Sequence, residues 1–399
     1  MRGVSSDVVA GAGVGAVART FLDAGGHAPM HAVTRAAFAQ ALDDGWADPR
    51  RLHAEGRRAR ALLDGARAAI ADLLGARTEE VFLSGSLTTA LHAAVLGIAR
   101  GRRRAGGDIV VSAVERSAVL AAAAFVAAQP PTHAGRCVTV GVDAAGRVDA
   151  AAMIQAVAAP GVALAALQHA NGEVGTTQPV AQVAQAARRA GVPLLVDAGA
   201  SAGHVEIPDT WDVLAADPGD WGGPGGLGVL AVRPRVRWAP QWPEDEDDWF
   251  PGGVSVPAAL AAAVALEHAV AQRATSAARR RGLVDRIRQS VAANVPDVEV
   301  AGDAVDRLPH VVTFSCLYVD GEALAGELDR LGFAVGSGSA CTSSALEPSH
   351  VLAAMGVLTH GNVRLTLPAD VTDDDVDRFL AVLPPAVRRV RDLLGAGEL

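Results

Sequence analysis

The sequence predicts an α/β protein with a mostly parallel central sheet covered by helices on both faces. One observation is a series of short apolar runs, which read as strands buried on both sides. The other is the alanine-rich stretches between these runs, which are long enough to form helices. The predicted strands are Glu80–Leu83, Asp108–Ser112, Cys137–Val142, Val162–Gln168, Pro193–Asp197, Trp211–Ala215 and Gly228–Val232.

Sequence features on either side of this series define its limits. Arg50 to Leu74 places apolar side chains on one helical face and arginines on the other, so it predicts an amphipathic helix before the first strand. After Arg233 the pattern stops at Trp238–Pro251, a Pro- and Trp-rich loop. Its acidic run Glu244–Asp248 predicts a solvated insertion, with a docking site for a basic partner as the alternative.

A second, smaller α+β unit is expected at the C-terminal end. A long alanine-rich helix should begin at Pro257 and run to about residue 278. The sequence then predicts strands and helices, and we expect an N-terminal extension (1–20), a large domain (21–256) and a small C-terminal domain (257–399). The strands are His310–Cys316 and Phe333–Val335, and the helices are Asp320–Leu331 and Asp373–Leu394.

Composition narrows the classes of function. Half of the 399 residues are hydrophobic and 20% are charged, which suits a globular protein with a large core. A net charge of -9 argues against nucleic acid as a partner, and no apolar run is long enough for a membrane span. Cys137, Cys316 and Cys341 have no metal-ligand spacing, and neither do the histidines. We therefore expect no metal site. The few cysteines suggest a reducing compartment, so we expect a cytoplasmic protein.

Several segments resemble those of one enzyme family. Ala170–Val180 reads ANGEVGTTQPV, and Val196–Ala198 reads VDA at a predicted strand end. Gly336–Ser343 reads GSGSACTS and is followed by Leu346–Ser349, LEPS. In this order, from Phe21 to near the C-terminus, the chain resembles the cysteine desulfurases of the class V aminotransferase group. That resemblance implies the fold-type-I architecture of pyridoxal-phosphate (PLP) transferases and a homodimer.

The departures from the family pattern concern the cofactor. None of the 35 Lys+Arg residues is a lysine, and an arginine cannot supply the free amine that forms a Schiff base with PLP. Asp197, the partner of the pyridine nitrogen, is retained. From this loss we expect no cofactor. By the same resemblance, several family residues are replaced in this chain. Asp220 replaces the lysine, Gly219 its histidine neighbour, Arg116 the ring-stacking histidine, Ala200 a glutamine, Gly172 an asparagine and Leu87 a phosphate-binding threonine (or Thr88 takes that place after a one-residue shift). The family segment that reaches across the dimer contains Val254 here.

The remaining family residues allow more than one reading. The resemblance makes Cys341 a persulfide-carrying thiol on a Gly/Ser loop, and the alternative is an inherited loop without a present role. Arg364 matches the arginine that clamps a substrate carboxylate, and the alternative is a structural ion pair. Asp197 is a ligand group, or else a relic or a helix-capping residue. Cys137 and Cys316 lie in apolar strand runs and should be buried.

Three functions are compatible with these residues. The first is a sulfur-transfer protein without desulfurase activity, in which Cys341 accepts or relays a persulfide, with an active cysteine desulfurase or a sulfur-acceptor protein as partner. The second is an enzyme with new, PLP-independent chemistry in the same cleft, using Cys341, Asp220 or Arg364. The third is a scaffold or degenerate relative without a role in sulfur transfer. We favour the first, and with it a protein that is not itself an enzyme.

Overall fold

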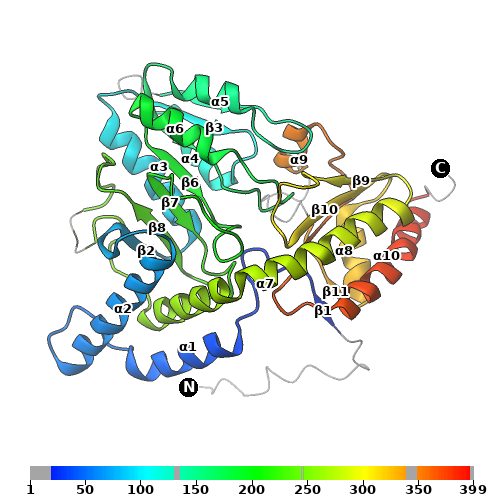
Figure 1. The fold of residues 1–399 in the computed structure, drawn as a ribbon, viewed down its shortest axis with the longest axis horizontal. Coiled ribbons are helices and arrows are strands. Elements are labelled where there is room, and N and C mark those ends of the chain that lie inside the picture. The colour runs from blue at the N-terminus through cyan, green and yellow to red at the C-terminus, as the bar shows by residue number, and fades with distance from the viewer. Residues whose placement is uncertain (1–18, 130–134, 244, 246, 338–347, 396–399) are drawn as a thin grey trace, which may run out of the picture.

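The computed structural model describes residues 19–129, 135–243, 245, 247–337 and 348–395. A seven-stranded sheet forms the centre of the larger part of the molecule, in the order β2-β8-β7-β6-β5-β3-β4 (Figure 1). β8 is antiparallel to both of its neighbours, and the other paired strands are parallel. The strands are β2 (Val81–Ser84), β3 (Asp108–Ser112), β4 (Cys137–Val140), β5 (Val162–Ala166), β6 (Leu194–Asp197), β7 (Val213–Ala216) and β8 (Gly228–Val232).

All seven strands predicted for this region belong to this sheet, which confirms the predicted α/β class. Successive side chains of a strand point to opposite faces. In β6, Leu194 and Val196 therefore join the core on one face, whereas Leu195 joins the core on the other. Both faces are covered, so the strands read as continuous apolar runs in the sequence.

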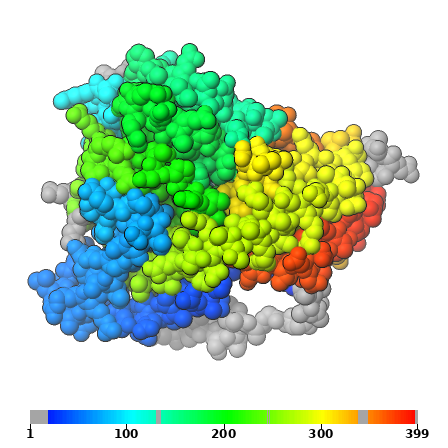
Figure 2. Space-filling model, in the orientation of Figure 1, coloured from blue at the N-terminus to red at the C-terminus, as the bar shows by residue number. Residues whose placement is uncertain are grey.

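Helices cover the two faces in distinct sets. α3 (Leu87–Arg102) and α4 (Ser117–Ala127) pack on the face to which Leu195 points. The opposite face carries α2, α5, α6 and the first half of α7, and α1 packs against α7 (Figures 1 and 2). These helices are α1 (Ala32–Asp44), α2 (Ala54–Leu73), α5 (Ala150–Val157), α6 (Val180–Ala190) and α7 (Val256–Asn294), and a short 3-10 helix spans Thr78–Glu80.

Helix α7 joins the two parts of the molecule. Ser255 caps its first turn by accepting a hydrogen bond from the Ala258 backbone N–H, and Pro257 fits in that turn. The helix is 39 residues long and extends well beyond the predicted end near residue 278. Leu283 and Ile287 lie past that point and pack into the core of the second part, so tertiary contacts continue the helix through the run of arginines at 279–281.

The second part is built on a three-stranded antiparallel sheet with β10 in the middle. Its strands are β9 (Val298–Ala301), β10 (Val311–Cys316) and β12 (Asn362–Thr366), of which only β10 was predicted. α8 (Gly321–Arg330), α9 (His350–Met355) and α10 (Asp373–Leu393) complete this part. β1 (Thr20–Phe21) pairs in parallel with β11 (Phe333–Ala334), so the first described strand lies in the C-terminal part. No helix among the described residues is long and apolar enough to span a lipid bilayer.

Candidate functional site

The family's cofactor positions meet at one edge of the central sheet. Asp197 ends β6, Arg116 precedes α4, Gly172 follows β5 and Asp220 follows β7. Carboxyl ends of parallel strands share an edge, and ligands of α/β proteins bind there. The topology therefore brings together side chains that are far apart in the sequence.

Asp197 and Arg116 form an ion pair at this edge. Arg116 Nε lies 2.7 Å from Asp197 Oδ2, and Asp197 Oδ1 accepts a 2.7 Å hydrogen bond from the Gly199 backbone N–H. Desolvation is the largest single effect and lowers the pKa of Arg116, but the charge and hydrogen bond of Asp197, together with the charges of Asp217 and Asp220, raise it overall, so the guanidinium stays protonated. The retained carboxylate is therefore engaged by Arg116, at the position where the family has a ring-stacking histidine.

Leu87 lies beside this ion pair, and Gly172 lies next to Ala200. Leu87 opens α3 and is buried. A Cβ added at Gly199 would lie 2.4 Å from Leu87 Cδ2 and 2.6 Å from Arg116 Nη2, so both side chains reach the space beside Asp197. A Cβ added at Gly172 would lie 3.2 Å from Ala200 Cβ. Val254 instead packs, half-buried, against the core of the larger part.

Asp220, which the sequence resemblance places at the family's lysine position, is 4% exposed. Its Oδ1 accepts a 2.8 Å hydrogen bond from the Gly26 backbone N–H, and its Oδ2 lies 3.2 Å from His204 Nε2. A Cβ at Gly219 would lie 2.2 Å from the Gly26 carbonyl oxygen, so this backbone arrangement leaves no room for a histidine there. Burial, helped by the charge of Asp220, raises the pKa of Asp217 to about 6.

A second buried carboxyl group lies behind Arg116. Glu115 is fully buried, and its Oε1 accepts a 2.8 Å hydrogen bond from the Gln168 backbone N–H. Desolvation is the main reason why its pKa rises to about 8, and the negative charge of Asp197 adds to the rise. Our reading of the sequence missed Glu115 as a site residue, although it lies next to Arg116 in the chain.

Arg364 lies on β12 in the second part, close to two acidic side chains. Its Nη2 is 3.2 Å from Asp23 Oδ1. Burial raises the pKa of Glu173, and the charge of Arg364 partly offsets that rise. These contacts match the predicted structural ion pair, and carboxylate binding by Arg364 stays a prediction.

The three cysteines have different surroundings. Cys341 lies outside the described residues. Cys316 is buried as predicted, and burial raises its pKa to about 11. The prediction that Cys137 is buried is wrong: it is half-exposed, because β4 is the last strand of the sheet and has a neighbour on one side only.

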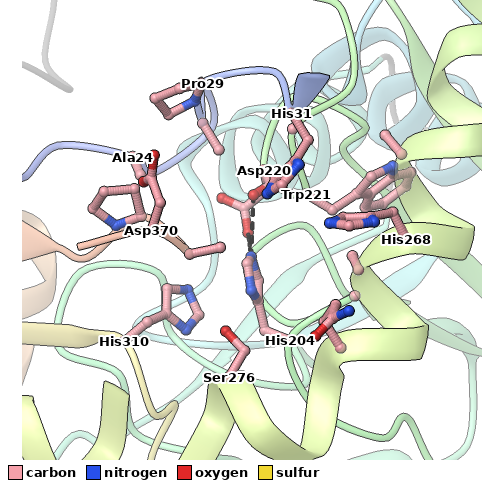
Figure 3. A pocket seen from close by; sticks show the side chains of 18 of the residues that line it. Ala24, Pro29, His31, His204, Asp220, Trp221, His268, Ser276, His310 and Asp370 are labelled. Atoms are coloured by element: carbon pink, nitrogen blue, oxygen red, sulfur yellow. Dashed lines mark hydrogen bonds and ion pairs between the residues drawn. The ribbon is translucent and has the colours of Figure 1, made fainter. Parts of the chain in front are cut away.

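A cavity of about 620 Å³ opens beside Asp220 (Figure 3). His204 and His310 line it with their rings 4.0 Å apart, and Arg280 Nη2 is 3.1 Å from His204 Nδ1. Burial lowers the pKa of His310 well below its usual value, so its ring is neutral. Sequence reasoning missed this group because its members lie on four separate segments. In the sequence, His310 could be noticed only as a polar residue in an apolar run.

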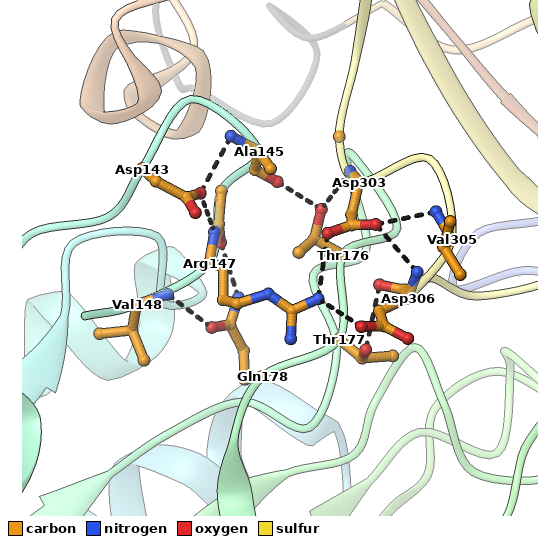
Figure 4. Close-up of polar contacts among 12 residues, drawn as sticks. Asp143, Ala145, Arg147, Val148, Thr176, Thr177, Gln178, Asp303, Val305 and Asp306 are labelled. Carbon is orange, nitrogen blue, oxygen red and sulfur yellow. Dashed lines mark hydrogen bonds and ion pairs between the residues drawn. The ribbon is translucent and has the colours of Figure 1, made fainter. Parts of the chain in front are cut away.

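The segment Ala170–Val180 is anchored to the second part by polar contacts (Figure 4). Arg147 Nη2 lies 3.0 Å from Asp303 and 3.1 Å from Asp306. Thr176 Oγ1 donates to the Ala145 carbonyl and accepts from the Asp303 backbone N–H. These contacts fix the loop that carries Gly172 relative to the sheet edge.

Comparison with known proteins identifies the family. The class-V aminotransferase family matches residues 20–379. This chain belongs to that family. It is 36% identical over 379 residues to a cysteine desulfurase of Cereibacter sphaeroides, covering 90% of this chain and 93% of the relative. An IscS-like cysteine desulfurase of Mycobacterium tuberculosis is 35% identical, covering 93% and 97%. The family resemblance found in the sequence is thus confirmed.

Solved structures support the fold independently. A NifS-like protein has a TM-score of 0.83 at 22% identity and covers 94% of this chain and 99% of its own. A cysteine desulfurase from Thermococcus onnurineus, determined in its apo form, has a TM-score of 0.77, covering 91% and 95%. The predicted fold-type-I architecture, a mostly parallel sheet flanked by helices, is therefore confirmed.

The expectation that the chain takes no cofactor is wrong by the same comparisons. The relatives are cysteine desulfurases, a PLP-dependent family, so the comparisons point to PLP. The physical reason is that a missing lysine removes only the covalent bond. PLP also binds through its phosphate and its ring, and these contacts need no amine.

The residues present do not fit the family's covalent mode of attachment. The chain has no lysine, and at the position that the resemblance assigns to the lysine, the carboxylate of Asp220 accepts a hydrogen bond from the Gly26 backbone N–H and lies 3.2 Å from His204 Nε2. Arg116 also holds the carboxylate that would face the pyridine nitrogen. A Schiff base between PLP and a lysine side chain therefore cannot form in this chain.

Proposed function

We propose that this chain acts in sulfur transfer as a cysteine-desulfurase relative that accepts or relays persulfide sulfur at Cys341, together with an active desulfurase. The observation that supports this most is Asp220 at the lysine position of a chain without lysine. Without an amine at this position, sulfur should come from a partner protein and not from free cysteine.

The proposed transfer is a thiol–disulfide-type exchange. The Cys341 thiolate attacks the terminal sulfur of the partner's persulfide, forming a new S–S bond on Cys341. The partner's S–S bond breaks, and its cysteine leaves as a thiolate that takes up a proton. Sulfur moves without net oxidation, so no additional oxidant is required.

The test is to incubate the full chain with an active cysteine desulfurase and cysteine, followed by mass spectrometry of the intact protein and its peptides. One added sulfur on Cys341 is expected, and Cys341→Ser should abolish it. Cys137→Ser is the matched control, because Cys137 is the more exposed of the two cysteines that the structure describes. If Cys341 stays unmodified while the desulfurase carries its own persulfide, the relay does not exist.

The family likeness also supports an assembly and a location. We propose a homodimer, which light scattering would reveal as twice the 40.6 kDa chain mass. We propose that the protein is cytoplasmic, because the free Cys137 and Cys316 thiols suit a reducing compartment. We also propose that the chain is divided into an extension (1–20), a large domain (21–256) and a small domain (257–399).

A further inference from the structure

We propose that His204, Asp220 and His310 form a binding site for a divalent transition-metal ion, which opens onto the 620 Å³ cavity. Each residue offers one ligand atom, and these atoms lie within 4.8 Å of one another. We call these three residues the His–Asp–His cluster. Two imidazoles and one carboxylate are a donor set that binds zinc or iron(II) in proteins.

The spacing inside the cluster suits a common metal ion. His204 Nε2 lies 3.2 Å from Asp220 Oδ2. Two ligand atoms that each lie about 2.0 Å from a tetrahedral zinc ion are separated by about 3.3 Å. The cluster thus needs little rearrangement at this pair, and all three side chains are already held in place by burial.

Two buried atoms of the cluster make no hydrogen bond within the described part of the chain, although one of them, Asp220 Oδ2, lies 3.2 Å from His204 Nε2. Asp220 Oδ2 and His310 Nδ1 are buried and make no hydrogen bond with the residues that the structure describes. An unsatisfied buried polar atom costs about 1–3 kcal/mol, and more for a charged group. A bound cation would satisfy the carboxylate oxygen and could use an imidazole nitrogen of His310 as a further ligand.

The cavity supplies the rest of the coordination sphere. The His–Asp–His cluster lies on its wall, together with His268 and Ser276 (Figure 3). Three protein ligands leave at least one position on the metal for water or a small molecule, as in catalytic zinc sites. The cavity is large enough to admit such a ligand, so the site is of the open type.

Arg280 acts against the metal and sets its affinity. It donates to His204 Nδ1, which therefore carries no proton, and the ring's proton resides on Nε2, 3.1 Å from the Asp220 carbonyl oxygen. A metal at Nε2 requires that proton to move to Nδ1, so Arg280 must turn away. Metal-bound histidines usually donate their other N–H to an acceptor, and an acceptor at position 280 should strengthen binding.

The experiment uses the full chain, stripped with a chelator, loaded with Zn²⁺ and desalted before elemental analysis. Wild type should retain about one zinc ion per chain. Asp220→Asn and His310→Gln should each raise the Kd for zinc by at least about 100-fold. His268→Gln, a cavity histidine outside the His–Asp–His cluster, should retain zinc. Absence of zinc in the wild type, or equal retention by the Asp220 and His310 variants, overturns the proposal.

Two further measurements separate this site from a folding defect. Co²⁺ added to the wild type should give visible d–d bands that shift when imidazole enters the open position, and an unchanged spectrum contradicts an open site. Arg280→Gln places an amide acceptor beside Nδ1 and should lower the Kd about 10-fold. Arg279→Gln is the matched control, because Arg279 hydrogen-bonds to the carbonyls of Val371 and Ala369 instead. Weaker binding by Arg280→Gln would refute the assigned role of Arg280.

Discussion

Replacement of Arg116 by histidine tests whether Arg116 competes with PLP for Asp197. In the structure, Arg116 Nε lies 2.7 Å from Asp197 Oδ2, the carboxylate that the family directs at the pyridine nitrogen. PLP must displace this contact to reach Asp197. Arg116→His removes the guanidinium and supplies a flat ring at the family's stacking position, so binding should become tighter.

The size of the effect follows from the contact that is lost. A hydrogen bond to a charged group contributes about 1.5–3 kcal/mol. The Arg116 side chain is 38% exposed, so solvent screening favours the lower end of this range. At 1.4 kcal/mol per factor of ten, the Kd of PLP should fall about 10-fold.

The assay is a titration of the full chain with PLP, followed by tryptophan fluorescence. Arg136→His is the matched control, because Arg136 forms an ion pair with Asp108 on the surface, with 78% of its side chain exposed. It should leave the Kd unchanged. An equal or higher Kd for folded Arg116→His would show that Arg116 does not compete for Asp197.

Three further outcomes are expected. Asp220→Lys alone should release no sulfide from cysteine above background, because Arg116 still holds Asp197; measured turnover would contradict this. Glu115 ionises near pH 4.5 when unfolded but only at about pH 8 when folded, so the folded state binds the extra proton between these values and its stability falls as pH rises through them. Urea unfolding of Glu115→Gln should lack this loss, about a few kcal/mol, and a parallel pH profile would refute it. In native alkylation, half-exposed Cys137 should react well before buried Cys316, whose pKa is about 11, and equal rates would contradict the assigned burial.

The central sheet could be predicted because its signal is local. A strand such as Asp108–Ser112 is apolar at its three central positions because both faces of the sheet are covered, and the alanine-rich stretches between strands indicate the helices. β9 and β12 were missed because polar residues interrupt their apolar ones, as Glu299 does in β9 and Arg364 does in β12. The end of α7 was missed because Leu283 and Ile287 pack against a core formed by distant segments.

The sequence by itself determined the α/β class, the family and the absence of any lysine, because these are properties of residue order and identity alone. Only the tertiary structure decided that Arg116 pairs with Asp197, and that Asp220 lies beside His204 and His310. The physical reason is that such contacts depend on strand order and on which helices pack together. Those are set by burial of the whole core, and they leave no periodic trace in the segments that carry the polar side chains.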